Sequence, residues 1–220
     1  MRLALLSFLM IVLSGTAALA DPRLDALLAA YPDRLASYTG DELVWKDGTR
    51  MPLGSANARR PFAEMLERGT IREQLAIPYP LAAAPFRPPA TDEDPGRIRN
   101  EAFFLKMYGD CRRGEVTAKL RAVAWLPRHG GGSVRATTVN GVADALEKVS
   151  RELDTLPEDM IRYLIPTSGI YNCRPIAGTD RLSVHAFGAA IDINAGFGDY
   201  WRWAKRPDGA LVWRNRIPRE

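Results

Sequence analysis

A proline-rich segment constrains the fold more than any other feature of the chain. Residues 78–95 are rich in proline and alanine and show no hydrophobic period. Proline fixes φ and lacks a backbone N–H, so neither a helix nor a central strand can run through such a segment. We therefore expect an N-terminal arm with its linker at residues 21–95 and a main domain at residues 96–220.

The first twenty residues have the pattern of an export signal. Arg2 precedes the apolar run Leu3–Leu13, and Ala18-Leu19-Ala20 has the small residues that a signal peptidase recognises. A membrane anchor is the alternative, but the run is shorter than the roughly 20 residues that cross a bilayer. We expect residues 1–20 to be cleaved, leaving an exported, periplasmic or extracellular protein without a membrane span.

Composition indicates an ordinary globular domain. Of the 220 residues, 46% are hydrophobic and 25% are charged, and the net charge of +4 is modest. No nucleic-acid-binding motif accompanies this charge, so we expect no nucleic-acid partner.

The chain has two cysteines, Cys111 and Cys173. Export to an oxidising compartment favours a disulfide between them. Zinc ligation is the competing hypothesis, but the pair lacks the Cys-x-x-Cys spacing of zinc sites.

Hydrophobic spacing and turn residues predict an α+β domain with an antiparallel sheet. Asp47-Gly48 is typical of a hairpin turn. The expected helices are 22–31, 61–75, 98–108 and 140–153. The expected strands are 43–45, 50–51, 119–126, 133–139, 169–173 and 189–194.

Residues that carry chemistry are concentrated in one segment. It contains Ser183-x-His185-x-x-Gly188-x-Ala190-x-Asp192. An imidazole and a carboxylate can bind one zinc ion if a sharp turn, here at Gly188, brings them together. On a strand, Ala190 and Asp192 would face this site, whereas Ala189, Ile191 and Ile193 would face the core.

This motif resembles the signature of the zinc metallopeptidase family of D-alanyl-D-alanine carboxypeptidases, D-Ala-D-Ala dipeptidases and L-alanyl-D-glutamate endolysins. The likeness extends to an exported bacterial branch of that family through residues 97–114, 139–156, 200–203 and 215–218. It implies an antiparallel sheet with flanking helices, the DD-peptidase or hedgehog-like metallopeptidase fold. It also implies zinc as cofactor and hydrolysis of peptidoglycan peptides at D-amino-acid bonds.

The resemblance also implies roles for individual residues. His185 and Asp192 match the zinc ligands, and Arg174, in Tyr171-x-x-Arg174, matches an arginine that stabilises the oxyanion of the tetrahedral intermediate. Ser183 would contact substrate or orient the turn. His129 lies in a glycine-rich turn, and we expect it to be exposed and without a role.

The chain departs from the family at its C-terminal end. The family's third zinc ligand is a histidine in an acid-x-x-His motif, and no such motif precedes Arg219-Glu220. We therefore expect a C-terminally truncated peptidase that lacks its last fold elements, or else a natural relative that binds wall peptides without hydrolysis. In both cases the expected zinc binding is weak and the expected hydrolysis negligible.

Overall fold

A computed structural model describes residues 20–55, 59–77, 90, 96–199 and 215–218. The expected signal peptide, nearly all of the proline-rich segment and residues 200–214 lie outside the described residues. The helices are α1 Pro22–Ala30, α2 Phe62–Arg68, α3 Ile71–Leu75, α4 Glu101–Tyr108, α5 Val142–Leu153 and α6 Glu158–Ile161. The strands are β1 Leu35–Tyr38, β2 Glu42–Trp45, β3 Arg50–Pro52, β4 Leu120–Ala124 and β5 Ser133–Thr137.

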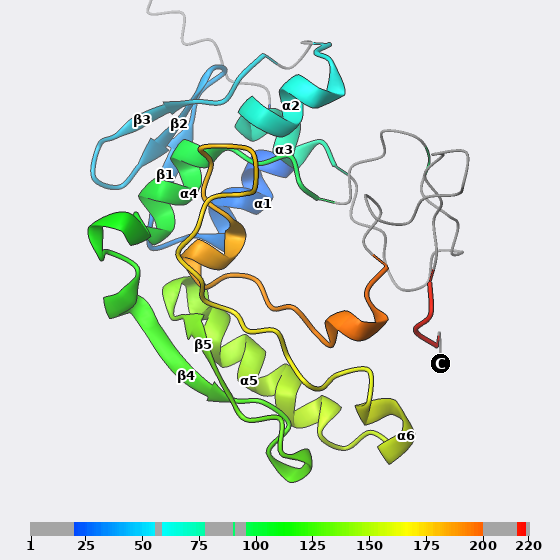
Figure 1. Cartoon of the computed structure of the whole chain (residues 1–220). Coiled ribbons are helices and arrows are strands. Elements are labelled where there is room, and N and C mark those ends of the chain that lie inside the picture. The colour runs from blue at the N-terminus through cyan, green and yellow to red at the C-terminus, as the bar shows by residue number, and fades with distance from the viewer. Residues whose placement is uncertain (1–19, 56–58, 78–89, 91–95, 200–214, 219–220) are drawn as a thin grey trace, which may run out of the picture.

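The strands form two small antiparallel sheets, β1-β2-β3 and β4-β5. Figure 1 shows the first sheet and α1 at one end of the molecule, and the β4-β5 hairpin with α5 at the other. The expected α+β class with antiparallel strands is confirmed. The strands expected at 169–173 and 189–194 are wrong, because the two segments form only one isolated bridge, Gly169 with Asp192.

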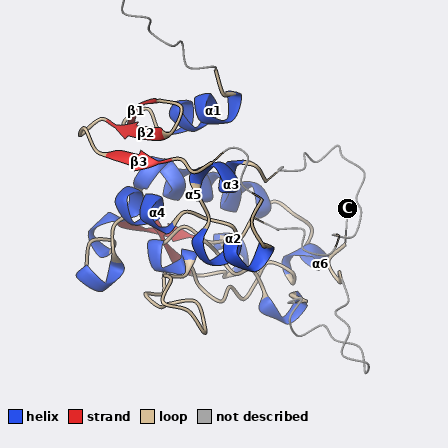
Figure 2. Cartoon of the chain, turned by 90° about the horizontal axis from the view of Figure 1, so that it is seen from above, coloured by secondary structure: helices blue, strands red, loops and turns tan. Residues whose placement is uncertain are grey.

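The N-terminal sheet contains the hairpin that its turn predicted. Gly48 has φ +83°, a value that glycine adopts without strain, and β2 and β3 pair on either side of it. Strand β1 was not predicted, because four residues at the edge of this sheet carry too short a pattern. In Figure 2, α1 lies next to this sheet.

Helix α4 is positioned by its two ends. The Asn100 side chain accepts a hydrogen bond from Phe103 N at 2.8 Å, and Gly109 ends the helix with φ +98°. The helix therefore begins at Glu101, three residues later than hydrophobic spacing suggested. The single helix expected at 61–75 is instead two helices, because Thr70 forms a capping box that starts α3.

The N-terminal residues and α4 share one hydrophobic core. The Phe103 ring lies 5.4 Å from the Trp45 ring and 5.9 Å from the Tyr31 ring, measured between centroids. The same cluster contains Ala186 and Phe187 from the motif segment, both fully buried. Residues 20–55 and 59–77 thus help to hold the segment that carries the candidate site.

A second core lies between the β4-β5 hairpin and α5. Its buried members are Val123, Trp125, Leu126, Val134, Ala136, Ala143 and Ile170. Ser150 fastens α5 to the hairpin, since its hydroxyl donates to Ala124 O at 2.8 Å and accepts from Leu126 N at 2.9 Å. The buried face of α5 therefore includes Ala143 and Ser150, whereas Val149 is 45% exposed.

Cys111 and Cys173 form the expected disulfide, with their Cα atoms 5.7 Å apart. The bond ties the residues after α4 to the segment that leads into the motif. Within the described ranges, no helix is both long enough and apolar enough to cross a membrane.

Replacing both cysteines with serine should lower the free energy of unfolding by about 4 kcal/mol, because the bond closes a loop between residues 62 positions apart. Urea denaturation of the oxidised protein and of the double variant measures the difference. Equal stabilities would show that this crosslink does not constrain the unfolded chain as we expect.

Candidate functional site

The first part of the motif folds as one turn of 3-10 helix, Val184–Phe187, ahead of the segment where a strand was expected. Ser183 starts this turn, and its Oγ accepts from His185 N at 3.4 Å. Ala186 and Phe187 anchor the turn in the core that includes α4. The Ser183 side chain is buried and caps the turn. Of the two roles expected for Ser183, this cap corresponds to orienting the turn. Contact of Ser183 with a substrate stays a prediction.

Gly188 ends the turn with φ +66° and lies against β5. Its carbonyl accepts from Thr137 N at 2.9 Å. A Cβ atom at position 188 would lie 2.5 Å from Leu120 Cδ2 and 3.1 Å from Thr137 N. Glycine is required here both for its backbone angle and for this close approach.

The His185 ring is oriented by a backbone carbonyl. Its Nδ1 lies 2.7 Å from Ile170 O. A carbonyl oxygen only accepts hydrogen bonds, so Nδ1 carries a proton. The other ring nitrogen, Nε2, lies 3.4 Å from Asp192 Oδ2. The His185 side chain is 14% exposed and that of Asp192 is 54% exposed, so the pair opens to solvent on the carboxylate side.

Asp192 is held by its backbone. Its carbonyl accepts from Ser168 N at 3.0 Å and its N–H donates to Gly169 O at 3.3 Å. This single bridge replaces the strand expected at 189–194. Ile193 was expected to face the core, but it is 42% exposed, because no strand continues beyond the isolated bridge at Asp192.

Residues 172–175 run antiparallel to the start of the motif. Asn172 N donates to His185 O at 3.1 Å, and Ser183 N donates to Arg174 O at 3.0 Å. The Arg174 side chain is exposed. Among the described residues, its guanidinium contacts only Pro175 O, which lies 3.5 Å from Nη1. Its guanidinium is therefore available to a ligand, while the neighbouring Cys173 disulfide restrains its backbone.

The structure thus brings together His185 and Asp192, and places the Arg174 and Ser183 backbones side by side. Over the ranges that the structure describes, no group of three or more histidine, cysteine or acidic side chains gathers as a metal site would require. The two cysteines are bonded to each other, which removes them as zinc ligands.

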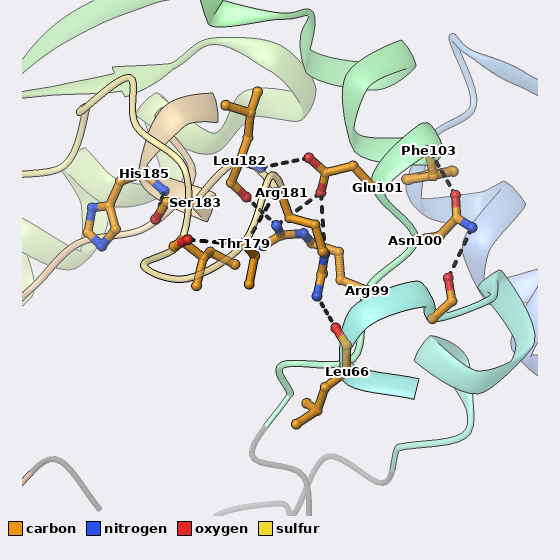
Figure 3. Close-up of polar contacts among 12 residues, drawn as sticks. Leu66, Arg99, Asn100, Glu101, Phe103, Thr179, Arg181, Leu182, Ser183 and His185 are labelled. Carbon is orange, nitrogen blue, oxygen red and sulfur yellow. Dashed lines mark hydrogen bonds and ion pairs between the residues drawn. The ribbon is translucent and has the colours of Figure 1, made fainter. Parts of the chain in front are cut away.

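A polar cluster next to the motif was missed by sequence reasoning (Figure 3). Glu101 Oε1 accepts from Leu182 N at 2.9 Å, and Arg99 Nη2 donates to Leu182 O and lies 3.1 Å from Glu101 Oε2. Arg181 Nε lies 3.9 Å from the same carboxylate oxygen. Burial lowers the pKa of the Arg99 guanidinium, and Glu101 opposes that shift.

His129 is not exposed as expected, since its side chain is 16% accessible. Its Nδ1 lies 3.1 Å from Glu158 Oε2 and its Nε2 lies 3.2 Å from Asp154 O. His129 therefore links the β4-β5 loop to the residues around α6, on a different part of the chain from His185.

Comparisons with protein-family models, with curated proteins and with solved structures found no match.

Replacing Gly188 with alanine should destabilise the fold more than replacing Gly130. Both glycines end a 3-10 turn at nearly equal angles, φ 66° and ψ 26° against φ 70° and ψ 25°, but only Gly188 has neighbours within reach of a Cβ atom. Both variants carry the same strain from the left-handed backbone angle. The difference between their free energies of unfolding is therefore the overpacking cost at position 188, about 1–3 kcal/mol. Chemical denaturation of both variants measures it. Equal losses would show that the approach of Gly188 to β5 is looser than described.

Proposed function

We propose that His185 and Asp192 are zinc ligands of a peptidase-type site that acts on peptidoglycan stem peptides at D-amino-acid bonds. The observation that carries this proposal is the position of the two side chains. With Nδ1 protonated and bonded to Ile170 O, a neutral His185 directs the lone pair of Nε2 toward a carboxylate oxygen 3.4 Å away. Two facing acceptors repel each other, so the contact is favourable only with a proton or a cation between them.

The separation of the two atoms fits a shared zinc ion. Zinc binds a histidine nitrogen at about 2.0–2.1 Å and a carboxylate oxygen at about 2.0–2.2 Å in tetrahedral geometry, which places such a pair of atoms about 3.4 Å apart. The hydrogen bond from Nδ1 to a carbonyl is the contact that metal-bound histidines usually make with their other nitrogen. The 3.4 Å separation supports zinc over a direct hydrogen bond of an ion pair, and the Nδ1 contact is compatible with zinc.

The neighbouring residues support peptide chemistry at this site. A zinc ion bound there would polarise a peptide carbonyl and acidify a bound water. Arg174 offers an exposed guanidinium on the segment that pairs with the motif, suited to hold a carboxylate or a developing oxyanion. The substrate class, D-amino-acid bonds of cell-wall peptides, rests on the resemblance of Ser183–Asp192 to the zinc metallopeptidase motif. The export signal would take the protein to that substrate.

One observation favours a second candidate, a related protein that binds cell-wall peptides without hydrolysis. A catalytic zinc takes three protein ligands and keeps one position open for water. The described residues provide only His185 and Asp192, and the other histidine, His129, makes contacts of its own around α6. Two ligands would hold zinc weakly, and no third acidic or histidine side chain of the described residues gathers with them to act as a general base.

Zinc titration of chelator-treated protein tests the site. We expect one zinc ion per chain, bound weakly. His185→Ala and Asp192→Asn should each weaken zinc affinity at least roughly tenfold, because even the loss of a residue that only orients a metal ligand usually costs that much. His129→Ala is the matched control and should leave zinc affinity unchanged. If His129→Ala weakens binding as much as His185→Ala, or if the His185 variant binds normally, the assignment is wrong.

Turnover separates the two candidates. The zinc-loaded protein is incubated with a stem pentapeptide ending in D-Ala-D-Ala, and peptide binding and D-alanine release are both measured. With two ligands we expect binding that Arg174→Ala weakens, and negligible release. Release of D-alanine that disappears in His185→Ala would instead establish the peptidase.

A further inference from the structure

The contacts of Leu182 reveal how the motif is held. This residue lies three positions before His185, and its side chain is 1% exposed. Both polar groups of its backbone are bound by side chains from the start of α4: Leu182 N by the Glu101 carboxylate at 2.9 Å, and Leu182 O by the Arg99 guanidinium. Figure 3 shows these two side chains reaching across to Leu182, with Ser183 and His185 following it along the chain.

Charge explains why this contact is specific. Arg99 is 6% exposed and packs over the Phe104 and Phe187 rings, with its Cζ 5.3 Å and 5.9 Å from their centroids. Glu101 lies beside both Arg99 and Arg181. Among the described residues, it is the only carboxylate that forms an ion pair with either of them. Buried guanidiniums need such a partner, and the 3.1 Å contact of Arg99 Nη2 with Oε2 holds the Glu101 carboxylate in place. The carboxylate in turn fixes Leu182 N.

The contact is transmitted to the imidazole through a short series of bonds. Ser183, the residue after Leu182, pairs through its N–H with Arg174 O and caps the turn by accepting from His185 N. The His185 carbonyl accepts from Asn172 N, and its ring bonds Ile170 O. A shift of the Leu182 backbone would therefore displace Ser183, which starts the turn, and with it the His185 imidazole.

We propose that Glu101, with Arg99, is a positioning residue for His185: the pair fixes the backbone of Leu182 so that the imidazole keeps Nδ1 on Ile170 O and Nε2 toward Asp192. The inference deepens the proposed zinc site and rests on it for its functional meaning. Its structural content, the orientation of the His185 ring, can be measured without any metal.

The test uses Glu101→Asp, which keeps the charge beside the arginines but withdraws the carboxylate from Leu182 N by one methylene. In long-range proton–nitrogen NMR spectra of the metal-free chain, wild-type His185 should show its proton on Nδ1, and the variant should show a mixture of tautomers. Hydrogen exchange at the Leu182 amide should accelerate at least tenfold, and zinc affinity should fall at least fivefold. Arg99→Met, which removes the two contacts that Nη2 makes with Glu101 Oε2 and Leu182 O, should change the same readouts and serves if the first variant does not fold.

Asn100→Ala is the matched control, because Asn100 caps the same helix through Phe103 N and Gly69 O without touching Leu182. It should lower the melting temperature and leave the His185 tautomer and zinc affinity as in wild type. The proposal is overturned if the Glu101 and Arg99 variants lose stability as Asn100→Ala does while the His185 tautomer stays unchanged. If wild type binds no zinc yet the tautomer responds as described, the proposed zinc site fails and the positioning role stands.

Discussion

The hydrogen bond between His185 Nδ1 and Ile170 O is the contact on which the candidate site depends. It fixes the tautomer of the ring and directs Nε2 toward Asp192, so the only polar group of the imidazole left for a ligand faces a carboxylate. His129 differs in that both of its nitrogens lie within hydrogen-bond distance of protein groups, 3.1 Å from Glu158 Oε2 and 3.2 Å from Asp154 O. The two histidines of this chain illustrate both arrangements.

The site lies where two cores meet. Ile170 belongs to the core beneath the β4-β5 hairpin, whereas Ala186 and Phe187 belong to the core formed with α4 and the N-terminal sheet. The His185–Ile170 bond and the contact of Gly188 with Thr137 connect them. Residues 20–55 and 59–77, which carry none of the candidate ligands, therefore contribute to the site by packing against α4. The disulfide adds a covalent link between the residues that follow α4 and residues 171–175.

Local signals in the sequence predicted some features and not others. Asp47-Gly48 and the cysteine pair predicted a hairpin and a disulfide, because the first depends on backbone angles and the second on simple chemistry. The strands at 169–173 and 189–194 were wrong because their pairing is limited to a single bridge. The buried contact of Glu101 with Leu182 spans 81 positions, and no local pattern marks a carboxylate with so distant a partner. The closeness of His185 and Asp192 was expected from the turn at Gly188, while zinc itself stays a proposal.

The central claim is that one metal ion lies between His185 Nε2 and Asp192 Oδ2. Crystals of the protein soaked in zinc and measured on both sides of the zinc absorption edge test it most directly. The account predicts an anomalous peak within bonding distance of both atoms, with Nδ1 still on Ile170 O. A peak elsewhere, or no peak with the imidazole and the carboxylate in direct contact, would contradict it.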